Sequence, residues 1–143
     1  MTTDNNQYKG SITADTTLTK NFSATEVMMS RYSSTDGAVL AVRGDDADWD
    51  GNFLVLLIPV QNQTSGSLEV SESYERNKAR IHFNRFLGGE EPVRGYAQSG
   101  KITFEYDQQG NTVNGTGHFK VRSDDLGHEY TFEKLEFSVQ PVK

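Results

Sequence analysis

Acidic side chains gather in one short stretch of the chain, residues 45–52. Asp46, Asp48 and Asp50 occupy alternate positions there, and Gly51 follows them directly. Carboxylates with this spacing can curl around a Ca²⁺ ion, because each side chain turns inward while the glycine allows a tight turn. Clustered carboxylates also repel one another unless a cation sits among them. The spacing therefore makes Asp46, Asp48 and Asp50 a candidate calcium site.

From Asp46 to Gly51 the pattern resembles the first half of an EF-hand calcium loop. Such a loop takes a bidentate glutamate from a position that Leu57 fills here, and no flanking helices are indicated, so a true EF-hand is excluded. Acidic loops of this kind also join β-strands in other calcium proteins, with a further ligand supplied from elsewhere in the chain. The alternative is a solvated hairpin loop whose acids discourage edge-to-edge strand pairing.

Trp49, the single tryptophan, lies inside this acidic loop. An exposed indole could stack on a sugar ring or insert into a protein partner, whereas an indole folded back would cap the core. Together with Asp45 and Asn52, Trp49 forms the candidate ligand-binding set. Residues 43–45 also spell Arg-Gly-Asp, a triplet that often arises by chance and gives little support to an adhesion role.

No catalytic residue is nominated by the sequence. The three histidines, His82, His118 and His128, are far apart along the chain, and a metal site would need several of them to converge. No Gly-x-Ser-x-Gly, His-Glu-x-x-His or phosphate-binding loop is present. Enzyme activity is therefore left open and is not the favoured interpretation.

Positive charge is concentrated in the middle of the chain, at Arg76, Lys78, Arg80, Arg85 and Arg94. On a chain with a net charge of −6, this group is either a patch for an anionic ligand or partner, or a solvated face.

Composition narrows the class of protein. A chain of 143 residues is expected to form one domain, and its net charge of −6 argues against nucleic acid and anionic membranes as partners. No apolar run is long enough to span a bilayer as a helix. Cysteine is absent, which excludes disulfides and thiolate metal sites. Because the first residues also lack the basic and apolar character of a secretory signal, a cytoplasmic location is expected.

Apolar and polar residues alternate along most of the chain, which predicts β-strands. The predicted strands cover residues 9–18, 24–32, 38–43, 52–60, 68–74, a stretch beginning at 79, 101–106, 113–121 and 130–139. Residues 88–100 are predicted to be a long irregular connection, and the last three strands an antiparallel meander. The apolar phase switches at Glu133–Lys134, which predicts a β-bulge there.

Residues 53–58 are apolar at every position. Because a strand of this kind is expected to bury both faces, we place it at the centre of the fold. One face would meet the rest of the core. The other would need a loop or a second copy of the chain, so a homodimer is a further hypothesis.

Strand number and spacing predict an all-β domain over residues 9–143, after a flexible N-terminus of residues 1–8. An antiparallel two-sheet sandwich of eight or nine strands is the expected fold, and an up-and-down calycin-like barrel is the alternative.

Three functions follow from these patterns. The first is a non-catalytic binding or interaction module that presents the acidic Trp-containing loop to a protein or carbohydrate ligand. The second is a calcium-dependent carbohydrate-binding domain that uses the same loop, with calcium as its only cofactor. The third is a barrel-type enzyme or small-ligand carrier with an interior pocket built from Tyr74, Arg80, His82 and Tyr106.

Overall fold

The computed structural model describes residues 7–17, 21–46, 52–61, 63–86, 92–122 and 129–142. These residues form one ten-stranded antiparallel sheet in the order β5-β8-β9-β10-β1-β2-β3-β4-β6-β7. The strands are β1 (Tyr8–Thr16), β2 (Phe22–Ser34), β3 (Gly37–Asp46), β4 (Phe53–Pro59), β5 (Ser65–Ser71), β6 (Arg80–Phe86), β7 (Pro92–Tyr96), β8 (Ser99–Asp107), β9 (Thr112–Arg122) and β10 (Glu129–Pro141). The described residues include no helix with the length and apolar character needed to cross a membrane.

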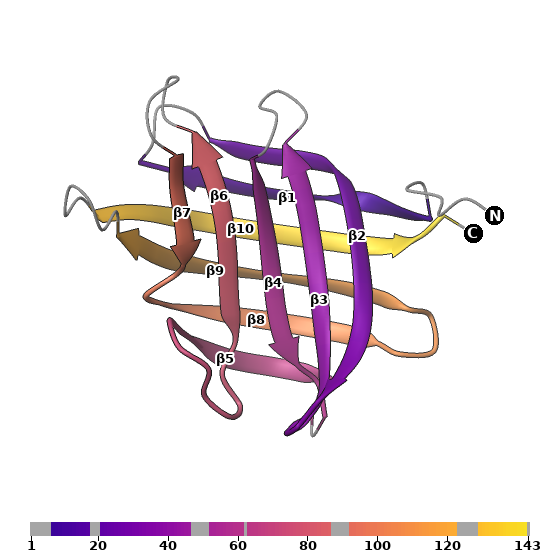
Figure 1. Ribbon diagram of the computed structural model, residues 1–143. Helices are drawn as coiled ribbons and strands as arrows, with labels where there is room; N and C mark the ends of the chain where they lie inside the picture. Colours follow the sequence, from indigo (N-terminus) through magenta and orange to yellow (C-terminus); the bar gives the residue numbers. More distant parts are fainter. Residues whose placement is uncertain are drawn as a thin grey trace.

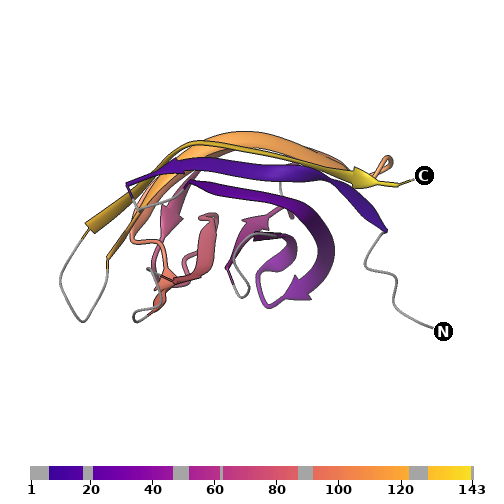
Figure 2. The same cartoon turned by 90° about the horizontal axis from the view of Figure 1, so that it is seen from above.

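The sheet curls over itself into a half-barrel with two layers. In Figure 1, β2, β3, β4, β6 and β7 run down the view in front of β1, β10, β9, β8 and β5, which run across it. Seen from above in Figure 2, the rear strands arch over the front strands. The predicted two-sheet sandwich of eight or nine strands is therefore corrected to one continuous sheet, while the all-β class is confirmed.

At one corner of the sheet, β2 forms backbone hydrogen bonds with strands of both the rear and the front layer. Phe22 to Ala24 pair with β1, and the strand pairs with β3 from Ala24 onward. The register slips between Ala24 and Glu26, and an irregularity of this kind bends a strand and increases its twist. One long strand thus belongs to both layers.

The opposite corner lies between β7 and β8. The Ala97 N–H donates to the Ile81 carbonyl of β6, and the next N–H, that of Gln98, donates to the Lys120 carbonyl of β9. Adjacent residues therefore pair with strands of different layers. The two layers are thus also linked on this side, although the described residues of β7 and β8 are not paired with each other in the sheet.

The core fills the space between the two layers. Phe119 of β9 and Phe132 of β10 stack with ring centroids 4.5 Å apart in the rear layer. Phe83 of β6 in the front layer lies 6.5 Å from Phe132, and all three rings are buried. Such aromatic contacts add to the stabilisation that comes from removing apolar surface from water.

The apolar run of β4 is buried on one face only. Leu54 and Ile58 are fully buried, whereas Phe53, Val55 and Leu57 on the outer face are half-buried. The strand pairs with β3 and β6, two places from the β7 edge, so it is not at the centre of the sheet. The expectation of two buried faces and a central position was wrong, because an all-apolar run carries no period that separates an inner from an outer face.

Other sequence predictions have mixed outcomes. The β-bulge is confirmed, since the pairing of β10 with β9 shifts register between Phe132 and Leu135 and Lys134 has a φ of 52°. The final meander is confirmed as β8, β9 and β10. The long irregular connection at 88–100 was wrong, because it holds β7 and the start of β8. Tyr8, placed in the flexible N-terminus, already belongs to β1, and residues 1–6 lie outside the described residues.

Candidate functional site

The predicted calcium-binding and ligand-binding residues fall into two groups. Asp48, Trp49 and Asp50 lie outside the described residues. Asp46 and Asn52 close the β3–β4 hairpin, where the Asp46 N–H donates to the Asn52 carbonyl at 2.9 Å. Their side chains are buried, with 5% of Asp46 and 1% of Asn52 exposed. These two residues therefore mark where the hairpin leaves the sheet rather than forming part of an open loop.

Asp45 is the partner of Arg43 on the outer face of β3. Arg43 donates from Nε to Asp45 Oδ2 at 3.0 Å and from Nη2 to Oδ1 at 2.9 Å. This hydrogen bonding raises the pKa of the Arg43 guanidinium, which also lies 4.4 Å from the centroid of the Phe53 ring. The Arg-Gly-Asp triplet is thus part of a strand, and its carboxylate is paired with its own arginine.

Within the described part of the chain, no three His, Cys, Asp or Glu side chains converge on one point. Asp48 and Asp50 are not in that part, so the calcium site stays a prediction.

A pocket of about 510 Å³ opens on the outer face of β3 and β4. Its floor includes Val39, Leu57 and Pro59, which alternate with the buried residues of their strands. Tyr32 and Tyr74 stand at its rim and are about half exposed, at 46% and 53%. An apolar floor with aromatic and polar groups around it is the usual form of a site for a small organic ligand.

One wall of the pocket is the turn between β2 and β3. The Ser34 hydroxyl donates to the Gly37 carbonyl at 2.9 Å and accepts the Asp36 N–H at 3.3 Å. Gly37 has a φ of 117°, and a Cβ there would lie 2.5 Å from the Gln61 side chain. Gln61 in turn accepts the Ala38 N–H at 2.9 Å. The turn therefore needs glycine at this position both for its backbone conformation and for the space that Gln61 fills.

The other wall is the segment that joins β5 to β6. The Ser71 hydroxyl donates to Glu75 Oε2 at 2.7 Å, and the Lys78 N–H donates to the Glu75 carbonyl at 3.2 Å. Asn77 takes a left-handed conformation, with a φ of 65°, that asparagine tolerates better than most residues. Ala79 then exchanges backbone hydrogen bonds with the end of β5. These contacts fix the side chains that face the pocket.

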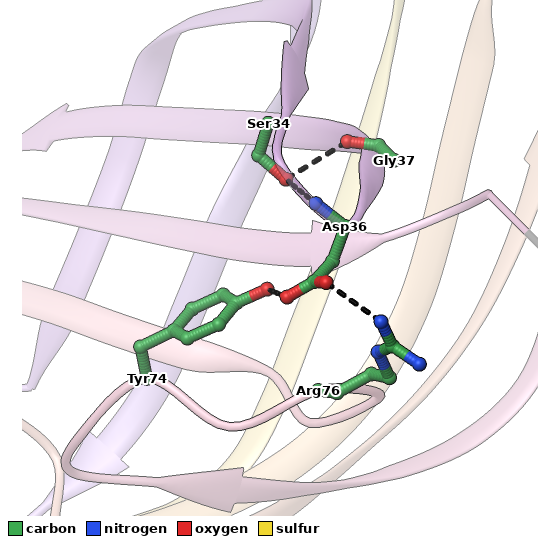
Figure 3. A network of polar contacts seen from close by, with 5 residues as sticks. All are labelled: Ser34, Asp36, Gly37, Tyr74 and Arg76. Carbon is green, nitrogen blue, oxygen red and sulfur yellow. Dashed lines mark hydrogen bonds and ion pairs between the residues drawn. The ribbon is translucent and has the colours of Figure 1, made fainter.

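The two walls are joined by Asp36, Tyr74 and Arg76 (Figure 3). The Tyr74 hydroxyl donates to Asp36 Oδ2, and Arg76 Nη2 donates to Oδ1 at 2.9 Å. The hydrogen bond from Tyr74, and then that from Arg76, lower the pKa of the Asp36 carboxyl, while the carboxylate raises the pKa of Tyr74. Asp36 is therefore ionised at neutral pH. It ties the β2–β3 turn to the segment that joins β5 to β6.

Arg80 enters the pocket from the first position of β6. Its guanidinium carbon lies 4.0 Å from the centroid of the Tyr96 ring, and Tyr96 stacks on His82 with centroids 5.0 Å apart. His82 also makes an edge contact with Phe53 at 5.4 Å. Burial, followed by the charges of Arg43 and Arg80, lowers the pKa of His82. A continuous row of contacts between aromatic rings and guanidinium groups therefore crosses the outer face. It orients the guanidinium plane of Arg80.

The pocket differs from the interior one expected for a carrier. Tyr74 and Arg80 do line it, but on the outer face of the sheet. Tyr106 is buried in the core from β8, and His82 supports Arg80 through Tyr96. That expectation was wrong in placing these four side chains around one interior space.

The pocket was not predicted from the sequence, although the positively charged residues in the middle of the chain were identified. Of that group, Arg76, Lys78 and Arg80 line the pocket, and the side chains of Arg85 and Arg94 lie outside the described residues. The pocket draws on segments that are distant in sequence, and no local spacing signals it. Comparison with protein-family models, with curated proteins and with solved structures gave no match.

Proposed function

We propose that this protein is a non-catalytic binding module that takes a small ligand in the pocket on the outer face of β3 and β4. The observation that carries the proposal is the pocket itself, with its apolar floor at Leu57 and Pro59 and two half-exposed tyrosines at its rim. Tyrosine offers a large, stiff contact surface at a low cost in conformational entropy, which suits ligand binding.

The lining groups that could take part in catalysis serve to hold the walls. Ser34 bonds to the backbone of its own turn, Asp36 bonds to Tyr74 and Arg76, and Glu75 accepts from Ser71. Side chains committed in this way pre-organise a pocket, which lowers the entropic cost of binding. This arrangement supports binding rather than catalysis.

The test uses a neutral apolar probe, N-phenyl-1-naphthylamine, whose fluorescence rises when it leaves water. We expect saturable binding to the wild type and loss of binding in Leu57→Trp, because the larger side chain fills the floor. Val55→Trp is the matched control, since Val55 lies on the same face of the same strand and does not line the pocket. Thermal melting of each variant checks that it folds.

Binding to the wild type and to Val55→Trp, but not to Leu57→Trp, supports the proposal. Equal binding to all three proteins, or no binding to any, overturns it.

The role of the acidic loop is a separate proposal, in which Trp49 contacts a protein or carbohydrate and calcium joins Asp46, Asp48 and Asp50. The resemblance to other acidic β-hairpin loops supports it, whereas the burial of Asp46 limits what that carboxylate can reach. Calorimetric titration with CaCl₂ tests it, with Asp48→Asn/Asp50→Asn as the comparison. If CaCl₂ produces no heat of binding and no shift in melting temperature, the loop does not bind calcium.

A further inference from the structure

The charges in the pocket do not balance. Three cations, Arg76, Lys78 and Arg80, line it together with two acids, Asp36 and Glu75. Hydrogen bonds from Tyr74 and Ser71 are the largest causes that lower the pKa values of Asp36 and Glu75, so both acids are charged at neutral pH. One cation is therefore left over on a chain whose net charge is −6.

That cation is Arg80. Arg76 pairs with Asp36 at 2.9 Å, and Lys78 lies 3.3 Å from Glu75. Arg80 has no carboxylate partner among the described residues, and its buried Nε has no hydrogen-bond acceptor there. Native proteins satisfy nearly all buried polar groups, so a guanidinium that is not fully hydrogen-bonded within the described part of the protein is an unusual feature.

The setting of Arg80 also suits the recognition of an anion. Tyr96 covers one face of the guanidinium at 4.0 Å, and this stacking leaves the N–H groups, which lie in its plane, available as donors. The apolar floor at Leu57, which is the backbone partner of Arg80, begins directly beside the charge.

We propose that the ligand is an amphipathic anion whose charged group binds Arg80 and whose apolar or aromatic body lies on Leu57 and Pro59. This inference rests on the proposed function, because it names the chemical class of ligand for the same pocket. A carboxylate, sulfonate or phosphate group attached to an apolar body shares the required chemistry, since the guanidinium fork matches all three.

The test compares two probes that share one ring system. These are 8-anilinonaphthalene-1-sulfonate, which is an anion, and N-phenyl-1-naphthylamine, which lacks the sulfonate. We expect the anion to bind the wild type about tenfold more tightly, which is the scale of one charge-assisted hydrogen bond. Arg80→Met should remove this advantage, so that the two probes bind the variant with similar affinities, while Arg80→Lys should restore part of it.

Arg122→Met is the matched control, because Arg122 lies on β9 in the rear layer and does not line the pocket. Equal affinities of the two probes for the wild type, or an advantage that survives Arg80→Met, would overturn the anion proposal and leave the proposed function intact. If both probes bind Leu57→Trp as tightly as they bind the wild type, the proposed function fails. The anion proposal then fails with it.

Discussion

Asp36 lies where two segments nearly forty positions apart meet, and its carboxylate accepts from both Tyr74 and Arg76. We expect Tyr74→Phe to raise the pKa of Asp36, because it removes the largest cause that lowers this pKa, while Arg76 keeps it below the ordinary value. NMR titration of the side-chain carboxyl carbons measures the change. Tyr32→Phe, at the same rim, should leave the pKa of Asp36 as it is.

The same contact has a defined dependence on pH. A carboxyl whose pKa is lowered by folding contributes stability above its unfolded pKa of about 3.9, and the contribution is lost as the pH falls through the folded value. The difference in stability between wild type and Tyr74→Phe should therefore shrink in acid. A difference that stays constant to pH 2 would contradict the assigned role of the carboxylate.

His82 offers a second test at the scale of one side chain. Its pKa is lowered chiefly by burial and then by Arg43 and Arg80, so its imidazole is neutral at pH 7. In Arg80→Met its pKa should rise but remain below the ordinary value of about 6.5, because burial persists. Neutral His82 contributes stability above that unfolded value, and this is lost as the pH falls through the folded one. Proton NMR of the imidazole follows the titration, and an unchanged midpoint in the variant would contradict the assignment.

At the scale of elements, the bulge in β10 is the feature that sequence predicted most sharply. The apolar phase switches across it, and Lys134 takes a left-handed conformation that costs a non-glycine residue about 1–2 kcal/mol. We expect Lys134→Gly to stabilise the protein by up to about 1 kcal/mol, since the relief exceeds the entropy lost by glycine. Lys134→Val should destabilise it by a similar amount, because β-branched residues resist this conformation.

Urea denaturation of the two variants measures the difference, with Lys120→Gly as a control at an exposed and regular position of β9. Loss of stability in Lys134→Gly as large as that in Lys120→Gly would show that the backbone at the bulge is not strained.

The strands that sequence predicted and those that it missed differ in a physical way. Alternation identified most of the strands, because one side of each faces the core and the other faces water. It failed at β7, where Pro92 and Gly95 suggest a loop although proline is tolerated on an edge strand. For β4 the strand itself was predicted, but not which face is buried, because the outer residues are apolar yet only half-buried.

At the scale of the whole molecule, the order of the strands outside the final meander could not be predicted from the sequence. No local feature of the sequence distinguishes a strand that ends at a corner of the sheet from one that continues around it. β2 continues around its corner and pairs with strands of both layers. The pocket shares this difficulty, since Asp36, Leu57 and Arg80 meet only after the sheet has curled. The concentration of cations was visible in the sequence, but not which of them would lack a carboxylate partner.

A homodimer through the outer face of the front layer stays a prediction. Met28 and Tyr32 are exposed there, at 43% and 46%, next to the half-buried residues of β4. The hypothesis predicts twice the mass of one chain by light scattering, and a monomer in Tyr32→Glu. It also predicts weaker probe binding at higher protein concentration, because the same surface would be shared. A single-chain mass at micromolar concentration would contradict it.

The two corners have a further consequence. Because β2 belongs to both layers and residues 97 and 98 join them on the other side, we expect the two layers to unfold together. Scanning calorimetry should therefore record a single endotherm whose van't Hoff and calorimetric enthalpies agree. Severing the polypeptide between β6 and β7 should yield fragments that gain structure only when they are mixed.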